Sequence, residues 1–357
     1  MFSTDYYSGK TVFVTGHTGF KGSWLCKILN RLGATVVGYS LDYPTDPCLF
    51  SISNLSSEVE TIYGDIRNHE LLLESLKKHS PDVVFHLAAQ PLVRKGYDEP
   101  RTTFETNVMG TVNLLESIRV IKSVQSVLNI TTDKVYKNEE WEQGYRETDR
   151  LGGYDPYSNS KSCSELVTKC YAQCFLNSVP VSTARAGNVI GGGDFAEDRI
   201  IPDCVRSASA GTPIPIRNPN SVRPYQHVLE PLFAYLMIAE RQAADPTLSG
   251  EYNIGPDDDG CVCTENLVKT FCKDWGGSAT YRVAEQRNAP HESNYLKLDC
   301  SKIKQVFGWR PGLNIHDAVR RTVEWSKAYV NKEDVNKVMD SQIDEYMRCI
   351  GGGSHER

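Results

Sequence analysis

The chain has 357 residues, of which 40% are hydrophobic and 24% are charged, as is usual for a globular protein with a large core. A formal net charge of −6 argues against a nucleic-acid-binding or anionic-membrane-binding protein, because both need a basic surface. No apolar run approaches the roughly 18–20 residues of a transmembrane helix. The first residues, MFSTDYYSGKTVFV, lack the basic and apolar regions of a secretory signal, so we expect a cytoplasmic protein.

The eleven cysteines form no Cys-x-x-Cys pair. Cys261 and Cys263 are the closest pair, and their spacing is not that of a zinc site. We therefore expect reduced thiols and no bound metal. The last residues, GGGSHER at 351–357, are expected to form a flexible tail.

The first 180 residues alternate short β-branched runs with helical patterns. The predicted strands are Thr11–Thr15, Thr35–Tyr39, Val59–Tyr63, Val83–Leu87, Val124–Ile130 and Val179–Ala184. The predicted helices are Lys21–Leu32, His69–His79, Thr102–Ile121 and Tyr157–Asn177. Strands that are apolar on both faces and alternate with helices indicate an α/β, Rossmann-type doubly wound fold with a parallel sheet. A mixed α+β domain is the alternative.

The composition of the sequence changes after Asn188, where glycine and proline become frequent. Two helices are predicted near the end of the chain, at Ile315–Tyr329 and Lys332–Met347. We expect a large domain over residues 1–187 and a smaller region over 188–350, with exchange of chain segments between them allowed.

A glycine-rich loop follows the first predicted strand. In VTGHTGFKGSWL, Gly16, Gly19 and Gly22 have the spacing G-x-x-G-x-x-G between a strand and a helix. Gly16 allows the tight turn, Gly19 lets backbone amides approach a pyrophosphate, and Gly22 lets the helix pack close to the sheet. The sequence therefore predicts a dinucleotide-binding domain over 1–187, which leaves 188–350 to bind the substrate.

An acidic residue, Asp42, follows the second predicted strand. A carboxylate there accepts the ribose hydroxyls of NAD and repels the 2′-phosphate of NADP, so we expect NAD. A solvated loop residue is the alternative for Asp42. Further cofactor contacts are expected in the glycine loop and at the ends of the third and fourth strands. They are Thr18, Phe20, Asp65, Ile66, Ala88, Ala89 and Gln90.

Tyr157 and Lys161 are four residues apart on a predicted helix and therefore share a face. The Lys161 ammonium and a nicotinamide cation would lower the pKa of Tyr157 from about 10. The resulting phenolate can take a proton from a sugar hydroxyl while hydride leaves the carbon. A surface pair is the alternative, and the upstream glycine loop favours the catalytic interpretation.

The segments VTGHTGFKGSWL, HLAAQ, TNVMGTVNLLE and YSNSK together resemble the extended short-chain dehydrogenase/reductase family. In that family a Ser or Thr at the end of the fifth strand assists the tyrosine, and Thr132 holds that place. The resemblance also implies a cofactor contact at Asn107. It further implies a homodimer that pairs the helices at 102–121 and 157–177, although loops could cover their apolar faces instead.

Residues 132–134, Thr-Asp-Lys, follow the fifth predicted strand. The nucleotide-sugar 4,6-dehydratases of the family resemble one another in a Thr-Asp-Glu cluster here, and Lys134 stands where Glu is usual. With RAGNVIGGGDFAEDRIIPD and SVRPYQHVLEP, the pattern is similar to dehydratases that act on CDP-glucose. The implied reaction is oxidation at C4, loss of water across C5 and C6, and hydride return to C6. Another NDP-hexose dehydratase, a 4-epimerase and a non-catalytic dinucleotide sensor are the alternatives.

The resemblance implies separate roles for the two residues after Thr132. Asp133 would protonate the departing C6 oxygen and so needs a raised pKa. Lys134 could be a neutral base at C5, a cation that stabilises the enolate, or a structural partner of Asp133. These three possibilities stay open.

The substrate-binding residues are expected in the second half of the chain. Arg199 and Arg223 are suited to the diphosphate, because arginine forms bidentate contacts with phosphate. By resemblance the full set of substrate contacts is Asn188, Arg199, Arg217, Arg223, His291 and Tyr295. The preference for cytosine rests on the resemblance alone.

Overall fold

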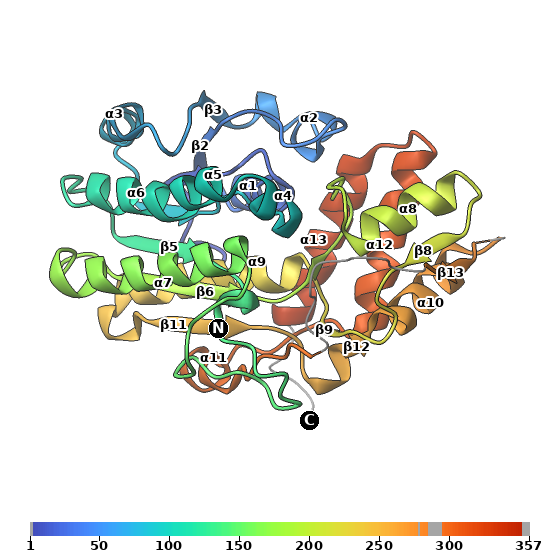
Figure 1. The fold of residues 1–357 in the computed structure, drawn as a ribbon. Helices are drawn as coiled ribbons and strands as arrows, with labels where there is room; N and C mark the ends of the chain where they lie inside the picture. Colours follow the sequence, from blue (N-terminus) through green and yellow to red (C-terminus); the bar gives the residue numbers. More distant parts are fainter. Residues whose placement is uncertain (1–2, 278, 285–294, 352–357) are drawn as a thin grey trace.

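The computed structural model describes residues 3–277, 279–284 and 295–351, and a seven-stranded parallel sheet lies at its centre (Figure 1). Its strands are β1 (Thr11–Thr15), β2 (Thr35–Ser40), β3 (Glu60–Tyr63), β4 (Val83–His86), β5 (Ser126–Ile130), β6 (Val181–Ala186) and β11 (Glu251–Ile254). They lie in the order β11-β6-β5-β4-β1-β2-β3, with every neighbouring pair parallel. The predicted parallel α/β sheet is confirmed, and each predicted strand is present with ends that differ by at most two residues.

Helices cover both faces of this sheet. α1 (Phe20–Arg31) and α9 (Leu229–Ala244) share a core cluster with Val12 and Val14 of β1. α3 (His69–His79), α6 (Gly110–Ile118) and α7 (Pro156–Cys174) pack on the opposite face, against the cluster that contains Phe13. Successive strand residues point to opposite faces, so a strand that is apolar throughout serves both layers.

The helix predicted at Thr102–Ile121 is present but contains an irregular turn. It runs through α5 (Pro100–Phe104), the π-helical turn η2 (Glu105–Met109) and α6 without a break. A π-turn inserts one extra residue into the helix and often marks a functional site. Here it contains Asn107, which was predicted to contact the cofactor.

The second half of the chain forms a helical group beside the sheet (Figure 1). α8 (Ile200–Ser209), α10 (Thr264–Trp275) and α12 (Ile315–Val330) share a core of their own, and α13 (Val335–Gly351) packs on α12. The last helix was predicted to begin at Lys332 and begins at Val335.

The chain also returns to the sheet after residue 188. α9 packs on β5 and β6, and β11 extends the sheet beyond β6. Neither element was predicted. α9 is buried along most of its length and so lacks the polar face that reveals a surface helix. The predicted boundary between the two domains at residue 188 stays a prediction. Residues 229–254 are the segment of the second region that returns to the sheet of the first.

Short elements complete the described part of the chain. They are α2 (Leu49–Ile52), η1 (Leu55–Ser57), α4 (Val93–Asp98), η3 (Asp133–Val135), β7 (Val189–Ile190), β8 (Ile214–Ile216), β9 (Val222–Pro224), β10 (Gln226–His227), η4 (Pro246–Leu248), η5 (Asp258–Gly260), β12 (Cys261–Cys263), β13 (Tyr281–Val283) and α11 (Ser301–Phe307). No disulfide links the cysteines of the described residues. Within the described residues no helix is long and apolar enough to span a membrane, and no cluster of three metal-ligating side chains occurs.

Candidate active site

The glycine loop has the geometry that a dinucleotide needs. Gly16 has φ +73°, and a Cβ there would lie 2.7 Å from the backbone nitrogen of Ala88. A Cβ on Gly22 would lie 2.2 Å from the Gly16 carbonyl oxygen, so both positions require glycine. Gly19 is the N-cap of α1 and, within the described chain, no side chain caps this helix and its first turn carries no acidic residue. The amides at the start of α1 are therefore available to phosphate oxygens, which fits the expected cofactor.

Asp42 lies beside this loop. The Thr18 hydroxyl donates to the Asp42 carbonyl oxygen at 2.7 Å, which ties the loop to the end of β2. The Asp42 carboxylate is exposed and accepts the Tyr43 N–H at 2.7 Å. The contact of Asp42 with ribose stays a prediction. Phe20 begins α1 and is partly buried.

The end of β3 forms one wall of a cavity of about 510 Å³, lined by Asp65, Arg67, Asn68, Glu105, Met109 and Asn113. The Asp65 carboxylate pairs with the Arg67 guanidinium at 2.6 Å. Ile66 is buried against the π-turn, since a Cβ on Gly110 would lie 2.6 Å from its Cγ2 atom. The cavity lies at the end of the third strand, where cofactor contacts were expected.

Asn107 connects the end of β4 to the helix that carries Tyr157. Its side-chain oxygen accepts the Gln90 N–H at 2.8 Å, and its amide nitrogen donates to the Gln90 carbonyl at 3.1 Å and to Ser160 Oγ at 2.8 Å. Ala88 donates its N–H to Thr15 Oγ1 at 3.2 Å, and Ala89 follows it in the same loop. Asn107 thus holds α7 in place through bonds within the protein, and its cofactor contact stays a prediction.

The Thr-Asp-Lys segment forms η3, a short 3₁₀ turn at the end of β5. Thr132 caps this turn by accepting the Lys134 N–H at 3.4 Å. Its hydroxyl also bonds the Asp133 carboxyl at 2.9 Å and the Tyr157 side chain. A hydroxyl has only one proton to donate. When Asp133 is protonated it can donate to Thr132, which leaves the Thr132 proton for Tyr157.

Asp133 is only 2% exposed, and its Oδ2 atom is buried without a hydrogen-bond partner among the described residues. Burial raises the pKa of Asp133, and the nearby Lys134, Thr132 and Arg223 oppose this only in part. The direction agrees with the expectation for a general acid. Lys134 is partly buried beside this carboxyl, so the turn brings both expected groups together.

Tyr157 and Lys161 are both affected by burial. In the protein without cofactor, burial raises the pKa of Tyr157 to about 12, because desolvation of the phenolate outweighs the bond from Thr132. The lowered pKa expected beside the nicotinamide cation stays a prediction. The Lys161 ammonium donates to the Ile130 carbonyl at 3.0 Å, and burial lowers the pKa of Lys161 to about 8. Arg199 favours the phenolate, and the positive nicotinamide would add to this effect when the cofactor is bound.

Two of the predicted arginines lie near the catalytic turn. Arg199 is the N-cap of α8, pairs with Asp194 at 2.9 Å and acts electrostatically on Tyr157. Arg223 on β9 is 4% exposed and close enough to Asp133 to lower its pKa. Both guanidinium groups are therefore brought to the same end of the sheet as Thr132.

The other predicted substrate contacts are less clearly connected to the catalytic turn. Arg217 pairs with Asp198 at 2.6 Å and with Asp203 at 3.0 Å, so its charge is already compensated. Asn188 is partly buried, and its carbonyl accepts a backbone N–H from β10. Tyr295 is partly buried and bridges β9. His291 lies outside the described residues.

Sequence reasoning missed three inward-facing residues of this region. His17 of the glycine loop bonds Ser40 Oγ at 2.9 Å, and burial lowers the pKa of His17 to about 4. Lys21 on α1 and Tyr235 on α9 lie near the catalytic turn. Lys21 could have been noticed as a cation inside the glycine motif, whereas Tyr235 lies in an apolar run that offers no signal.

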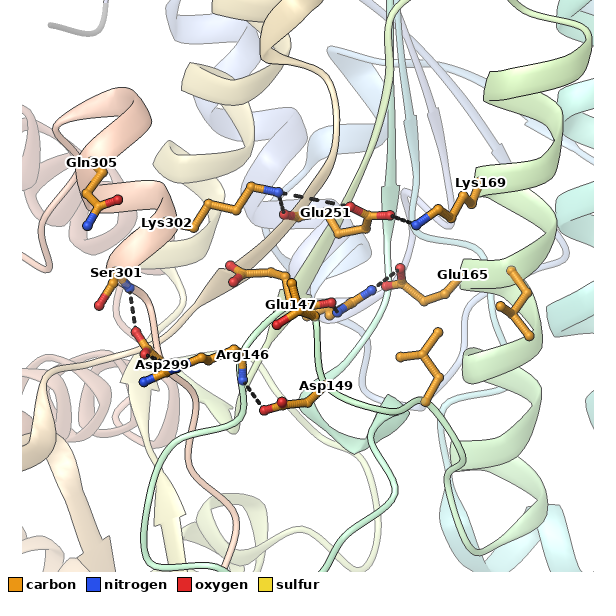
Figure 2. A pocket seen from close by; sticks show the side chains of 14 residues that line it. Arg146, Glu147, Asp149, Glu165, Lys169, Glu251, Asp299, Ser301, Lys302 and Gln305 are labelled. Atoms are coloured by element: carbon orange, nitrogen blue, oxygen red, sulfur yellow. Dashed lines mark hydrogen bonds and ion pairs between the residues drawn. The ribbon is translucent and has the colours of Figure 1, made fainter.

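A larger cavity, of about 750 Å³, lies at the β11 edge of the sheet and contains none of the expected catalytic residues (Figure 2). Most of its charged side chains are paired with one another. Arg185 pairs with Glu165 at 2.8 Å, and Lys169 pairs with Glu251 at 3.2 Å. Lys302 approaches Glu251 from the opposite side (Figure 2) and donates to its backbone carbonyl at 2.8 Å. The mutual neutralisation of these side chains favours the catalytic turn as the active site.

Comparison with known proteins places the chain among nucleotide-sugar enzymes. A family model described as GDP-mannose 4,6 dehydratase matches residues 13–322. CDP-glucose 4,6-dehydratase of Salmonella typhimurium is 46% identical over 355 residues, which cover 97% of this chain and 99% of that protein. dTDP-glucose 4,6-dehydratase 1 of Escherichia coli is 27% identical and covers 88% of this chain and 92% of its own length.

Solved structures share the fold at low sequence identity. A UDP-glucose 4-epimerase from Stenotrophomonas maltophila with bound NAD has a TM-score of 0.79 at 21% identity and covers 90% of this chain and 99% of its own. dTDP-glucose 4,6-dehydratase from Bacillus anthracis in complex with NAD has a TM-score of 0.75 at 21% identity, with coverage of 91% and 99%. On the family match and the 46% identity, this chain belongs to the GDP-mannose 4,6-dehydratase family of extended short-chain dehydrogenases/reductases.

Proposed function

We propose that this chain is an NAD-dependent hydro-lyase that converts CDP-D-glucose to CDP-4-dehydro-6-deoxy-D-glucose. The observation that carries the proposal is the buried, unpartnered carboxyl oxygen of Asp133 beside Tyr157. Epimerisation at C4 needs only the tyrosine, whereas loss of the C6 oxygen also needs an acid. The choice of CDP-glucose rests on the 46% identity to a CDP-glucose 4,6-dehydratase over nearly the whole chain.

The cofactor would bind along the glycine loop and at the ends of β2, β3 and β4. NAD supplies, when bound, the group that accepts hydride from C4 and returns it to C6. The uncapped start of α1 would bind its pyrophosphate, and Asp42 its ribose. Two structures of the same fold were solved with NAD bound, which supports this assignment.

The side chains of the turn would carry the proton transfers. Tyr157 takes the C4 hydroxyl proton, and Asp133 protonates the C6 oxygen as water leaves. Lys134 would remove the proton from C5 and later return it, which requires the neutral amine. Tyr157 therefore ends the turnover with one proton more and Asp133 with one fewer. Thr132 bonds to both groups, so transfer through its hydroxyl would restore the starting state.

Substrate binding would use the second half of the chain. Arg199 and Arg223 would neutralise the diphosphate, since both lie close to the catalytic turn. Arg217 would have to leave its ion pairs with Asp198 and Asp203 to contribute. Asn188, His291 and Tyr295 complete the proposed set of contacts.

We also propose a cytoplasmic homodimer. Phe104 and Met109 on the α5–η2–α6 helix and Leu166 on α7 are exposed apolar side chains, which supports an interface there. The enzyme would act on a small nucleotide sugar and would need no membrane or nucleic-acid partner.

The proposed reaction is tested by incubating the purified protein with NAD and each of CDP-, dTDP-, UDP- and GDP-glucose. We expect CDP-glucose to lose the mass of one water and to gain the 4-keto-6-deoxy signals in its NMR spectrum. An epimerase would conserve the mass, and fastest water loss from another nucleotide would correct the base preference. Failure of all four sugars to lose water would contradict the proposal.

A further inference from the structure

Lys21 is a cation without a counter-ion at the edge of the proposed active site. It is the second residue of α1, between Gly19 and Gly22 of the glycine motif. Its side chain is partly exposed. Within the described part of the chain its ammonium forms no hydrogen bond and no ion pair. The ammonium lies over the ring of Tyr235, 5.9 Å from the ring centroid.

The surroundings of Lys21 are unusually poor in negative charge. The charged groups that act on it are Lys161 and Arg199, which repel it, and Asp133, which attracts it. Burial raises the pKa of Asp133, so this carboxyl contributes little charge when it is protonated for catalysis. Beneath the ammonium, Tyr235 is fully buried and its hydroxyl has no partner in the described structure. Asp194 pairs with Arg199 and Glu165 attracts Lys161, whereas Asp133 is the one carboxyl among the described residues that acts on Lys21.

A partly buried charge without a partner is costly, and proteins normally pair such a charge. Burial, with Lys161 and Arg199, lowers the pKa of Lys21 to about 7, and an anion nearby would raise it again. The start of α1 also offers its backbone N–H groups on this side of the loop. The missing anion therefore belongs to a ligand.

We propose that the Lys21 ammonium binds a diphosphate group, from either the dinucleotide cofactor or the nucleotide sugar. The inference rests on the proposed function, because that function brings both diphosphates to this cleft. It assigns to Lys21 a binding role that the glycine motif by itself does not imply. Lysine suits the task because its ammonium can approach a phosphate from several directions as a compact charge.

The test compares Lys21→Met and Lys21→Arg with Lys27→Met, a lysine of the same helix that pairs with Asp340 at 3.4 Å instead. Dissociation constants for ADP-ribose and for CDP are measured by calorimetry, and thermal melting verifies that each variant is folded. We expect Lys21→Met to raise the dissociation constant of one of the two ligands by about tenfold to a hundredfold. Lys21→Arg and Lys27→Met should stay close to the wild type.

The ligand whose binding weakens identifies the source of the diphosphate. Weakening of ADP-ribose alone assigns Lys21 to the cofactor, and weakening of CDP alone assigns it to the sugar nucleotide. Unchanged or tighter binding of both ligands in a folded Lys21→Met variant would overturn the proposal. If that variant melts early, Lys21→Gln, which retains polarity and length, decides the question on the same criteria.

Adenosine and cytidine serve as ligands without phosphate, and their binding should not change in Lys21→Met. The same protein can then be assayed for water loss from CDP-glucose. A wild type that binds both diphosphates but acts on another sugar leaves the role of Lys21 intact and refutes only the proposed substrate.

Discussion

The catalytic turn depends on how a single hydroxyl, that of Thr132, is shared. It lies between a carboxyl whose pKa is raised by burial and a phenol whose pKa is raised to about 12. The sequence predicted these side chains, because their spacing is local and resembles a known motif. It could not predict the acidity of Tyr157, which depends on how deeply the fold buries the ring. It also missed Lys21, whose neighbours come from distant parts of the chain.

Changing Tyr157 to Phe should remove the group that accepts the C4 hydroxyl proton. We expect the rate of C4 oxidation to fall by about 10²–10⁴-fold, as is typical when a general base is lost. The reduced cofactor formed in a single turnover, followed by absorbance, measures this step. A rate in Tyr157→Phe equal to that of the wild type would remove the proposed role.

Changing Lys134 to Met should affect the second half of the reaction more than the first. Without the amine, exchange of solvent deuterium into C5 should slow by at least about tenfold more than C4 oxidation does. Mass spectrometry of product formed in D₂O measures the exchange, and single-turnover absorbance measures the oxidation. Equal slowing of both steps would reduce Lys134 to a structural partner of Asp133.

At the scale of elements, the predictions succeeded where the pattern was regular. β1 and α3 have the predicted bounds, because β-branched runs and amphipathic spacing identify them. α9 was missed because it is buried along most of its length and shows no clear polar face, and β11 because four residues are too short a pattern. The π-turn at 105–109 lies inside the predicted helix, and its sequence ETNVM contains no proline or glycine that would mark an irregular turn.

The glycines after β7 join the two halves by close packing. The Gly192 carbonyl accepts the Trp24 indole N–H at 2.9 Å, and a Cβ there would lie 2.0 Å from Trp325 Cγ. Gly192→Ala should therefore lower the free energy of unfolding by about 1–3 kcal/mol through overpacking. Urea denaturation measures the change. Gly250→Ala is the control, because its Cβ would meet only the end of the Lys302 side chain at 3.3 Å. Equal effects at the two sites would contradict the packing argument.

At the scale of the whole molecule, one buried carboxylate holds the C-terminal helix against the sheet layer. Glu230 on α9 accepts the Tyr346 hydroxyl at 2.8 Å and the Gly312 and Leu313 N–H groups. Burial raises the pKa of Glu230 from 4.5 to about 7, although these donors oppose the shift. The folded protein therefore binds the Glu230 proton more tightly than the unfolded chain does.

The stability of the protein should consequently depend on pH through Glu230. Below pH 4.5 both states are protonated; between 4.5 and about 7 only the unfolded state loses the proton, so stability falls as pH rises. The contribution is of the order of 3 kcal/mol. In Glu230→Gln this part of the pH dependence should vanish when urea denaturation at pH 5 is compared with pH 8. A variant that keeps the full difference would assign it to other groups.

The proposed homodimer is tested on α7. Leu166 is 57% exposed, and Leu166→Glu would place a charge in the expected interface, where burial of an unpaired carboxylate is costly. Sedimentation velocity should then show a monomer, or a dimer weakened by about 100-fold or more. Val283, which is 58% exposed on β13, gives the matched control Val283→Glu. A dimer of unchanged strength in Leu166→Glu would exclude this interface.

The return of residues 229–254 to the central sheet limits how the protein can be divided. A fragment that stopped at residue 187 would lack β11 and leave the backbone edge of β6 open, and without α9 it would bare the apolar layer above β5 and β6. Such an edge pairs readily with other chains and promotes aggregation. The chain must be synthesised well past its middle before the sheet can be completed, so we expect its two halves to fold as one unit.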